Sequence, residues 1–278
     1  MATYTIGVTH CLARAIRSIS SDTLVASMGL RVMNAEGALH QDWSPLAAKL
    51  GDFGPESLVP TNLVYQNVDV PDATPALPDG GAIYWSFILT NSGHSDSAFV
   101  AVANKAADAF AGALAGHIIE HPDIPSFLGL AAVLGAQELL NLLTANCDGV
   151  VAVLGLALTA RELVQMTADP ANWLNQINCP GTDSSVGCGG NSNYDVSYFI
   201  ADRALTTVPR LIGQSPQRLS GLAQNAGLYL STTSSRTGGL HQVPQAESQT
   251  PAPGTQVQPA TWVEATVIYP PARGHLPV

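Results

Sequence analysis

Runs of alternating apolar and polar residues are the feature that most restricts the fold of this chain. In the segment DTLVASMGLRV, one face would carry Leu24, Ala26, Met28, Leu30 and Val32, and the other face Val25, Ser27 and Arg31. The same alternation recurs in residues 82–91, 193–200 and 261–270. Because successive side chains of a strand point to opposite faces, these segments predict antiparallel sheets with one face on a core.

The side chains expected to point inward follow from the same alternation. They are Ile83, Trp85, Phe87 and Leu89; Tyr194, Val196, Tyr198 and Ile200; and Val263, Ala265, Val267 and Tyr269, the last set lying opposite Trp262, Glu264 and Thr266. Additional strands are predicted at residues 3–10, 62–70 and 150–158. About seven short strands separated by Pro, Gly and Asp turns are typical of a sandwich or a barrel. We therefore expect a mainly β protein built as an antiparallel β-sandwich.

The spacing of apolar residues changes between residues 97 and 145. From Ser97 to His121 they recur at intervals of three and four, which indicates an amphipathic helix that Pro122 ends. A second helix is predicted after Ser126, a favourable N-cap residue, and it is apolar on nearly all sides, as buried helices are. The sequence thus predicts an α-helical hairpin at about residues 97–145, inserted into the β fold.

The last part of the chain combines a polar, Pro-rich stretch with a strand. Residues 231–260 are rich in Ser, Thr, Gln, Pro and Gly, the composition of a linker or long arm. We expect a body at 1–242 that contains the helical insertion, a Pro/Gln-rich arm at 243–260, and a terminal strand at 261–278 that returns to a sheet. That sheet would belong to the same chain or, by strand exchange, to another subunit.

The charge balance restricts the partners. The chain has 21 Asp and Glu against 11 Lys and Arg, a formal net charge of −10, so its surface would repel phosphate groups. We expect no nucleic-acid partner. No apolar stretch reaches the roughly 18 to 20 residues that span a bilayer, so contact with a membrane would not involve a transmembrane helix.

The beginning of the chain and the cysteines bear on the compartment. The segment MATYTIGVTHC lacks the features of a signal peptide, as expected of a cytoplasmic protein or of the mature form of an exported one. Cys179 and Cys188 bracket a turn-rich loop, and a disulfide closing this ring would stabilise the fold by roughly 2 to 3 kcal/mol. Free thiols and zinc ligation are the alternatives. The disulfide favours an extracellular or exported protein.

A His-x-x-Glu-His motif is the sharpest chemical pattern in the sequence. His117, Glu120 and His121 share one face of the first predicted helix. The motif resembles the signature of inverted zinc proteases. By that resemblance the two histidines would bind zinc, and Glu120 would act as the catalytic base of a hydrolase.

Other features favour a structural role for these histidines. Histidine near the carboxyl end of a helix is stabilised by the helix dipole without a metal. Glu138, a candidate third ligand, lies roughly 18 Å along the second predicted helix, too far from His121 in an antiparallel hairpin. The other candidate, Glu162, forms a capping box with Thr159 at the start of a further helix.

Oxygen donors also gather in the turn-rich segment at residues 179–195. Asp183, Asn191, Asn193 and Asp195 have the ligand chemistry of calcium, although the spacing of an EF-hand loop is absent. The alternative is a set of turns in which these side chains bond to the backbone. Zinc, calcium or no cofactor at all are therefore open at this point.

Known catalytic motifs are otherwise missing from the sequence. It contains no Gly-x-Ser-x-Gly, Walker or Gly-x-Gly-x-x-Gly pattern. We therefore expect a non-enzymatic binding or assembly protein, exported and homo-oligomeric. The first alternative is a metal-dependent hydrolase that uses His117, Glu120 and His121. The second is a membrane-active, toxin-like protein that uses the helical hairpin.

Overall fold

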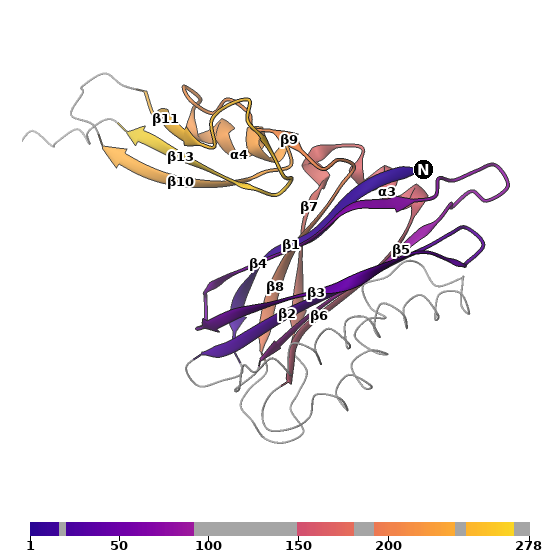
Figure 1. The fold of residues 1–278 in the computed structure, drawn as a ribbon. Coiled ribbons are helices and arrows are strands. Elements are labelled where there is room, and N and C mark those ends of the chain that lie inside the picture. Colours follow the sequence, from indigo (N-terminus) through magenta and orange to yellow (C-terminus); the bar gives the residue numbers. More distant parts are fainter. Residues whose placement is uncertain (17–20, 92–148, 181–191, 237–242, 270–278) are drawn as a thin grey trace, which may run out of the picture. The chain divides into compact units, whose positions relative to one another are not determined.

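The structure, a computed structural model, describes residues 1–16, 21–91, 149–180, 192–236 and 243–269 (Figure 1). The chain is mainly β, and most of its neighbouring strands are antiparallel, which confirms the coarse prediction from the alternation. It divides into two compact units. Unit 1 comprises Met1–Met166 and Asn175–Asp202, and unit 2 comprises Thr167–Leu174 and Arg203–Val278.

Unit 1 is built around two four-stranded sheets. The first, in the order β4-β1-β8-β7, consists of β4 (Leu58–Val70), β1 (Ala2–Ala15), β8 (Asn193–Ala201) and β7 (Leu174–Pro180). The second, in the order β3-β2-β5-β6, consists of β3 (Leu39–Phe53), β2 (Asp22–Met33), β5 (Ala82–Asn91) and β6 (Gly149–Thr159). The strands predicted at residues 3–10, 62–70 and 150–158 are confirmed as parts of β1, β4 and β6.

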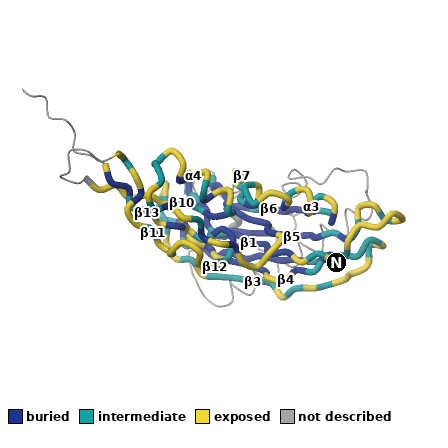
Figure 2. The backbone as a smooth tube through the Cα atoms, turned by 90° about the horizontal axis from the view of Figure 1, so that it is seen from above, coloured by how far each residue is buried: buried dark blue, intermediate teal, exposed yellow. Residues whose placement is uncertain are grey.

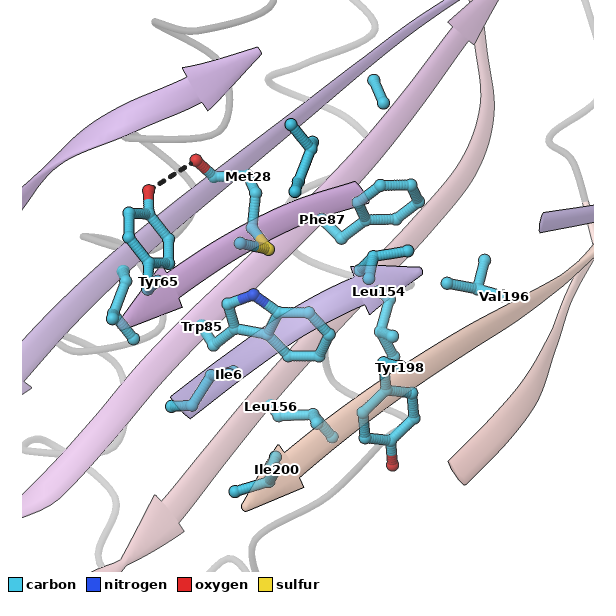
Figure 3. Close-up of a cluster of buried hydrophobic side chains, with 14 of the residues drawn as sticks. Ile6, Met28, Tyr65, Trp85, Phe87, Leu154, Leu156, Val196, Tyr198 and Ile200 are labelled. Atoms are coloured by element: carbon cyan, nitrogen blue, oxygen red, sulfur yellow. Dashed lines mark hydrogen bonds between the residues drawn. The ribbon is translucent and has the colours of Figure 1, made fainter. Parts of the chain in front are cut away.

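Residues from both sheets contribute to one hydrophobic core (Figure 3). The core contains the inward sets that the alternation predicts for β2, β5 and β8. Trp85 of β5 and Tyr198 of β8, for example, lie with their ring centroids 5.4 Å apart. The hydroxyl of Tyr65 donates to the carbonyl of Met28 at 2.8 Å, so this phenol is buried with its hydrogen bond satisfied.

The face of β2 and β5 that lies opposite this core is buried as well. Val25 and Ser27 of β2 are fully buried, and so are Ser86, Ile88 and Thr90 of β5. The hydroxyl side chains on this face can be buried when they bond to the backbone. Thr90 Oγ1 donates to the carbonyl of Val25 at 3.1 Å, which removes the cost of burying that hydroxyl.

Helix α3 (Ala160–Thr167) begins at the predicted capping box. The backbone N–H of Glu162 donates to Thr159 Oγ1 at 3.2 Å, and Glu162 Oε2 accepts from the backbone N–H of Thr159 at 2.8 Å. These two bonds satisfy donors that a helix start leaves free, so Glu162 has a structural role here. The predicted helical hairpin at residues 97–145 lies outside the described residues.

Unit 2 contains a three-stranded sheet with β13 (Trp262–Tyr269) between β10 (Tyr229–Arg236) and β11 (Gln245–Thr250) (Figure 1). Its other elements are η1 (Pro170–Asn172), α4 (Pro216–Gln224) and the paired short strands β9 (Thr206–Thr207) and β12 (Gln256–Val257). A second core includes Leu219 and Ala223 of α4 and Val263, Ala265 and Val267 of β13. Tyr269, which the alternation placed inward, is exposed, and Ile268 is buried instead.

Much of the predicted arm at 243–260 is ordered as β11 and β12. One glutamine side chain explains how so polar a segment packs. Gln249 Oε1 accepts from the N–H groups of Leu211 and Ile212 at 2.7 and 3.3 Å, and its amide donates to the carbonyls of Pro209 and Pro251 at 3.0 and 3.2 Å. The side chain thereby replaces water as the partner of four backbone groups, which composition alone does not reveal.

Candidate binding surface

Most of the chemical motifs predicted from sequence lie outside the described residues. This holds for His117, Glu120 and His121 and for Cys188, and equally for Asp183 and Asn191 of the calcium set. In the part of the chain that the structure does describe, no three His, Cys, Asp or Glu side chains are grouped to hold a metal ion. The zinc and calcium sites therefore stay predictions.

The other two members of the calcium set, Asn193 and Asp195, lie together on β8. The amide of Asn178 on β7 donates to both, at 2.6 Å to Asn193 Oδ1 and at 2.7 Å to Asp195 Oδ1. The other oxygen of Asp195 accepts from Arg14 Nε at 2.7 Å. Burial raises the pKa of Asp195, but hydrogen bonds from Asn178 and Arg14, with the charge of Arg14, bring that pKa below its ordinary value. An arginine already neutralises this carboxylate.

Replacing Asp195 by asparagine should lower the free energy of unfolding by about 1 to 2 kcal/mol at pH 7, because a charged hydrogen bond is lost. The low pKa of Asp195 means that its contribution is present above the ordinary aspartate pKa and is lost as the pH falls below it. Urea unfolding at pH 7 and pH 2 should therefore show a smaller difference between variant and parent at pH 2, whereas at pH 4 the difference should still be close to its pH 7 value.

Glu56 offers the matched control. Its carboxylate lies 3.7 Å from Arg14 Nη1, and its side chain is 69% exposed. An exposed pair of this kind contributes little, so Glu56→Gln should change the free energy of unfolding by less than about 0.5 kcal/mol. Equal losses for Glu56→Gln and Asp195→Asn would contradict the role assigned to Asp195.

The described cysteines are unsuited to nucleophilic or metal chemistry. Cys11 and Cys179 form no disulfide with another described residue, and both are buried. Burial raises the pKa of the Cys11 thiol, and burial together with the charge of Asp195 raises the pKa of Cys179 to about 12. Both thiols are therefore protonated at neutral pH, whereas the thiolate is the reactive form. The predicted bond from Cys179 to Cys188 stays a prediction, because Cys188 lies outside the described residues.

In unit 2, the two edges of the three-stranded sheet differ in how they are protected. On the β11 edge, the N–H of Gly213 donates to the carbonyl of Ala246 at 2.8 Å, and the N–H of Ala246 donates to the carbonyl of Gln214 at 2.9 Å. The β11–β13 pairing has an irregularity between Ala246 and Ser248, and Glu247 is exposed there. A covering segment, a bulge and a charge are the devices that prevent an edge from pairing further.

Among the described residues, the β10 edge has no covering segment and no bulge, and its one charge is Arg236 at the end of the strand. Its parallel pairing with β13 runs from Tyr229 to Arg236 without a register shift. The residues Tyr229–Ser235 include no charge and no proline, and those from Ser231 to Ser235 are all exposed (Figure 2). Within the described ranges, β13 is the one strand that pairs with β10. An edge strand with these properties is a template on which another strand can pair.

One hydrogen bond shows which backbone groups of β10 point toward β13 and which point away from it. The N–H of Tyr229 donates to the carbonyl of Thr261 at 3.1 Å, so this residue directs its backbone groups toward the β13 side. Alternate residues of a strand direct these groups to opposite sides. Ser231, Thr233 and Ser235 therefore bond toward β13, whereas Leu230, Thr232 and Ser234 direct their N–H and C=O groups away from it. We call these outward groups the open edge.

An aromatic pair lies at the first residue of β10. The rings of Tyr229 and Trp262 stack with centroids 4.9 Å apart and planes at 24°, and Trp262 is 39% exposed. Trp262 alternates with the buried Val263, so the pair lies on the face of the sheet opposite the core. On the same face, Thr233 Oγ1 donates to Thr266 Oγ1 at 3.3 Å. The side chains beside the open edge thus provide an apolar ring surface and a row of hydroxyl groups.

Sequence reasoning missed this surface because it took STTSSRTGG as linker. The Thr pair and the preceding Tyr229 are residue types enriched in strands, and they were the available signal. No described helix of the protein is both long and apolar enough to cross a lipid bilayer. The chain matches no protein-family model, and it matches no curated protein sequence.

Proposed function

We propose that this protein is a non-enzymatic binding or assembly protein that accepts an extended peptide segment as an added strand at the open edge of β10. The observation that carries the proposal is the exposed edge of β10, which pairs with β13 without a register shift and is uncharged from Tyr229 to Ser235, together with a β11 edge that is covered. Main-chain hydrogen bonds are the usual source of affinity in strand addition. In this proposal, unit 1 is an antiparallel β-sandwich, an assignment supported by the core that its two sheets share.

The chemistry of the edge indicates which segments would bind. Leu230, Thr232 and Ser234 each offer one N–H donor and one C=O acceptor, and such bonds contribute roughly 0.5 to 1.5 kcal/mol each after exchange with water. Because these gains are offset by the ordering of the segment, binding should be modest, in about the micromolar range. A neutral segment with β-branched residues would suit the uncharged strand best.

The alternatives from the sequence depend on residues outside the described ranges. The hydrolase would use His117, Glu120 and His121, and the toxin-like protein would use the helical hairpin at 97–145. No described residue favours either over the binding function. Export and the disulfide of Cys179 likewise remain predictions.

The proposal is tested with labelled eight-residue peptides that alternate Thr and Val, titrated against the full chain and followed by fluorescence polarisation. The variant Thr232→Pro removes an N–H group of the open edge and leaves the bonds of β10 to β13 in place, a position at which edge strands tolerate proline. We expect saturable binding to the parent chain, weakened by about tenfold or more in the proline variant through the lost bond and the disturbed pairing.

Thr232→Val is the matched control, since it keeps both the N–H group and the β-branched shape. Its affinity for the peptides should stay within about twofold of the parent value, because the hydroxyl makes no part of the strand pairing. Binding that Thr232→Pro leaves unchanged would rule out the open edge as the site.

A further inference from the structure

We infer that the strand added at the open edge is β10 of a second copy of this chain, paired antiparallel about a two-fold axis at Thr232. The product is a continuous six-stranded sheet in the order β11-β13-β10-β10-β13-β11. This inference rests on the proposed function and names its partner. This dimer differs from the strand exchange considered for residues 261–278. The strand in that segment, β13, pairs with β10 and β11 of its own chain.

The backbone pattern of β10 is self-complementary in this register. A two-fold axis perpendicular to the sheet at Thr232 pairs Leu230 with Ser234 and Thr232 with its own copy, which are the residues of the open edge. These become the hydrogen-bonded pairs of an antiparallel ladder, while Ser231 faces Thr233 and Tyr229 faces Ser235. The axis also keeps the face covered by α4 on the same side in both copies, so the two sheets join as one.

The side chains permit the approach. Ser231 to Ser235 are exposed on both faces of β10, so this part of the strand is accessible. The seven uncharged residues from Tyr229 to Ser235 are centred on Thr232, and the register therefore pairs this segment completely with itself. No like charges face each other across the axis in these pairs, and Thr and Ser side chains opposite one another are favourable partners.

The distribution of charge favours contact through this part of the chain. Residues 203–278 contain five arginines and two glutamates, whereas residues 1–202 contain six Lys and Arg against nineteen Asp and Glu. Two copies that met through surfaces of residues 1–202 would bring strongly acidic surfaces together, at an electrostatic cost. Residues 203–278, which contain β10, carry a net charge of +3, so contact through β10 brings no acidic surfaces together. The segment from Tyr229 to Ser235 also has no charge that would select an acidic or a basic peptide in place of a second copy.

The experiment is a charge exchange at the axis, measured by light scattering on the full chain after size-exclusion chromatography. The parent should have twice the 28.9 kDa mass of one chain. In Thr232→Lys, and equally in Thr232→Glu, two like charges would face each other across the axis, so the dissociation constant of either variant should rise by about tenfold or more. Mixing the two variants should restore the double mass, because Lys would then face Glu.

Ser248→Lys places the same charge on β11 and should leave the mass of the parent unchanged. A double mass that neither Thr232 variant reduces, or that their mixture does not restore, overturns the inference. A single-chain mass for the parent also overturns it. If the Thr-Val peptides nevertheless bind and Thr232→Pro weakens them, the proposed function stands with a different partner; if they do not bind, both proposals fail together.

Discussion

Replacing Gly227 by alanine is expected to lower the free energy of unfolding of unit 2 by about 3 to 5 kcal/mol, from two causes that add. Gly227 has φ +66°, a conformation that residues with a Cβ adopt at a cost of roughly 1 to 2 kcal/mol. A Cβ at this position would also lie 2.4 Å from Cε3 of Trp173. Such a contact forces a shift of the indole or of the backbone.

The indole of Trp173 has little freedom to give way. It is fully buried, its Nε1 donates to the carbonyl of Thr167 at 3.1 Å, and the guanidinium of Arg203 lies 4.9 Å from the ring centroid. A displaced ring would lose the hydrogen bond and weaken the cation–π contact. Urea unfolding followed by tryptophan fluorescence and near-ultraviolet circular dichroism measures the loss.

Gly213 separates the two causes. It also has positive φ, +83°, but a Cβ there would meet no atom within 4 Å. Gly213→Ala should therefore cost only the backbone part, about 1 to 2 kcal/mol. If the two alanine variants lost the same free energy, the contact with Trp173 would be shown to contribute nothing.

Strand faces were predictable from sequence where large apolar residues alternate with smaller ones. Trp85 and Phe87 of β5 and Tyr194 and Tyr198 of β8 could face only a core, and the structure buries all four. The alternation does not extend to β3, where Pro45 and Lys49 interrupt it and much of the strand is exposed. β3 is held by its pairing with β2, a relation between distant segments that local pattern does not contain.

Tyr229 and the Thr pair indicate a strand at β10, but the open edge of that strand could not be predicted because it consists of backbone groups. Every residue has an N–H or C=O group, so the sequence does not show which of them are left over after the sheets form. The open edge exists because β13 pairs on one side of β10 and no described strand pairs on the other. Side-chain motifs are easier to see in the sequence, but they say less about the binding surface. Asp195, for instance, was a candidate calcium ligand, and its carboxylate accepts hydrogen bonds from Arg14 and Asn178.

Removing the carboxylate of Asp22 is the second change expected to have a large effect. Asp22 on β2 is fully buried; its Oδ2 accepts from the hydroxyl of Tyr194 on β8 at 2.7 Å, and its Oδ1 accepts from the amide of Asn91 at 2.9 Å. The carboxylate thus bonds across the core of unit 1, from one sheet to the other. Asp22→Ala would leave buried donors without their acceptor and should cost about 3 to 5 kcal/mol in urea unfolding.

Asp52→Asn on β3 controls for the loss of a negative charge, because its carboxylate is exposed and bonds only at the surface, to Thr23 Oγ1. That change should stay within about 0.5 kcal/mol of the parent.

A double variant tests whether the bond to Tyr194 is the cause. Tyr194→Phe alone removes the hydroxyl and should cost about 1 to 3 kcal/mol, because one oxygen of Asp22 loses its donor. In Asp22→Ala, however, the buried hydroxyl of Tyr194 has already lost the carboxylate to which it donates. Adding Tyr194→Phe to Asp22→Ala should therefore cost less than it does in the parent, by about 1 kcal/mol or more. Strictly additive losses would mean that the two side chains stabilise unit 1 independently, and the bond between the sheets would then carry none of the effect.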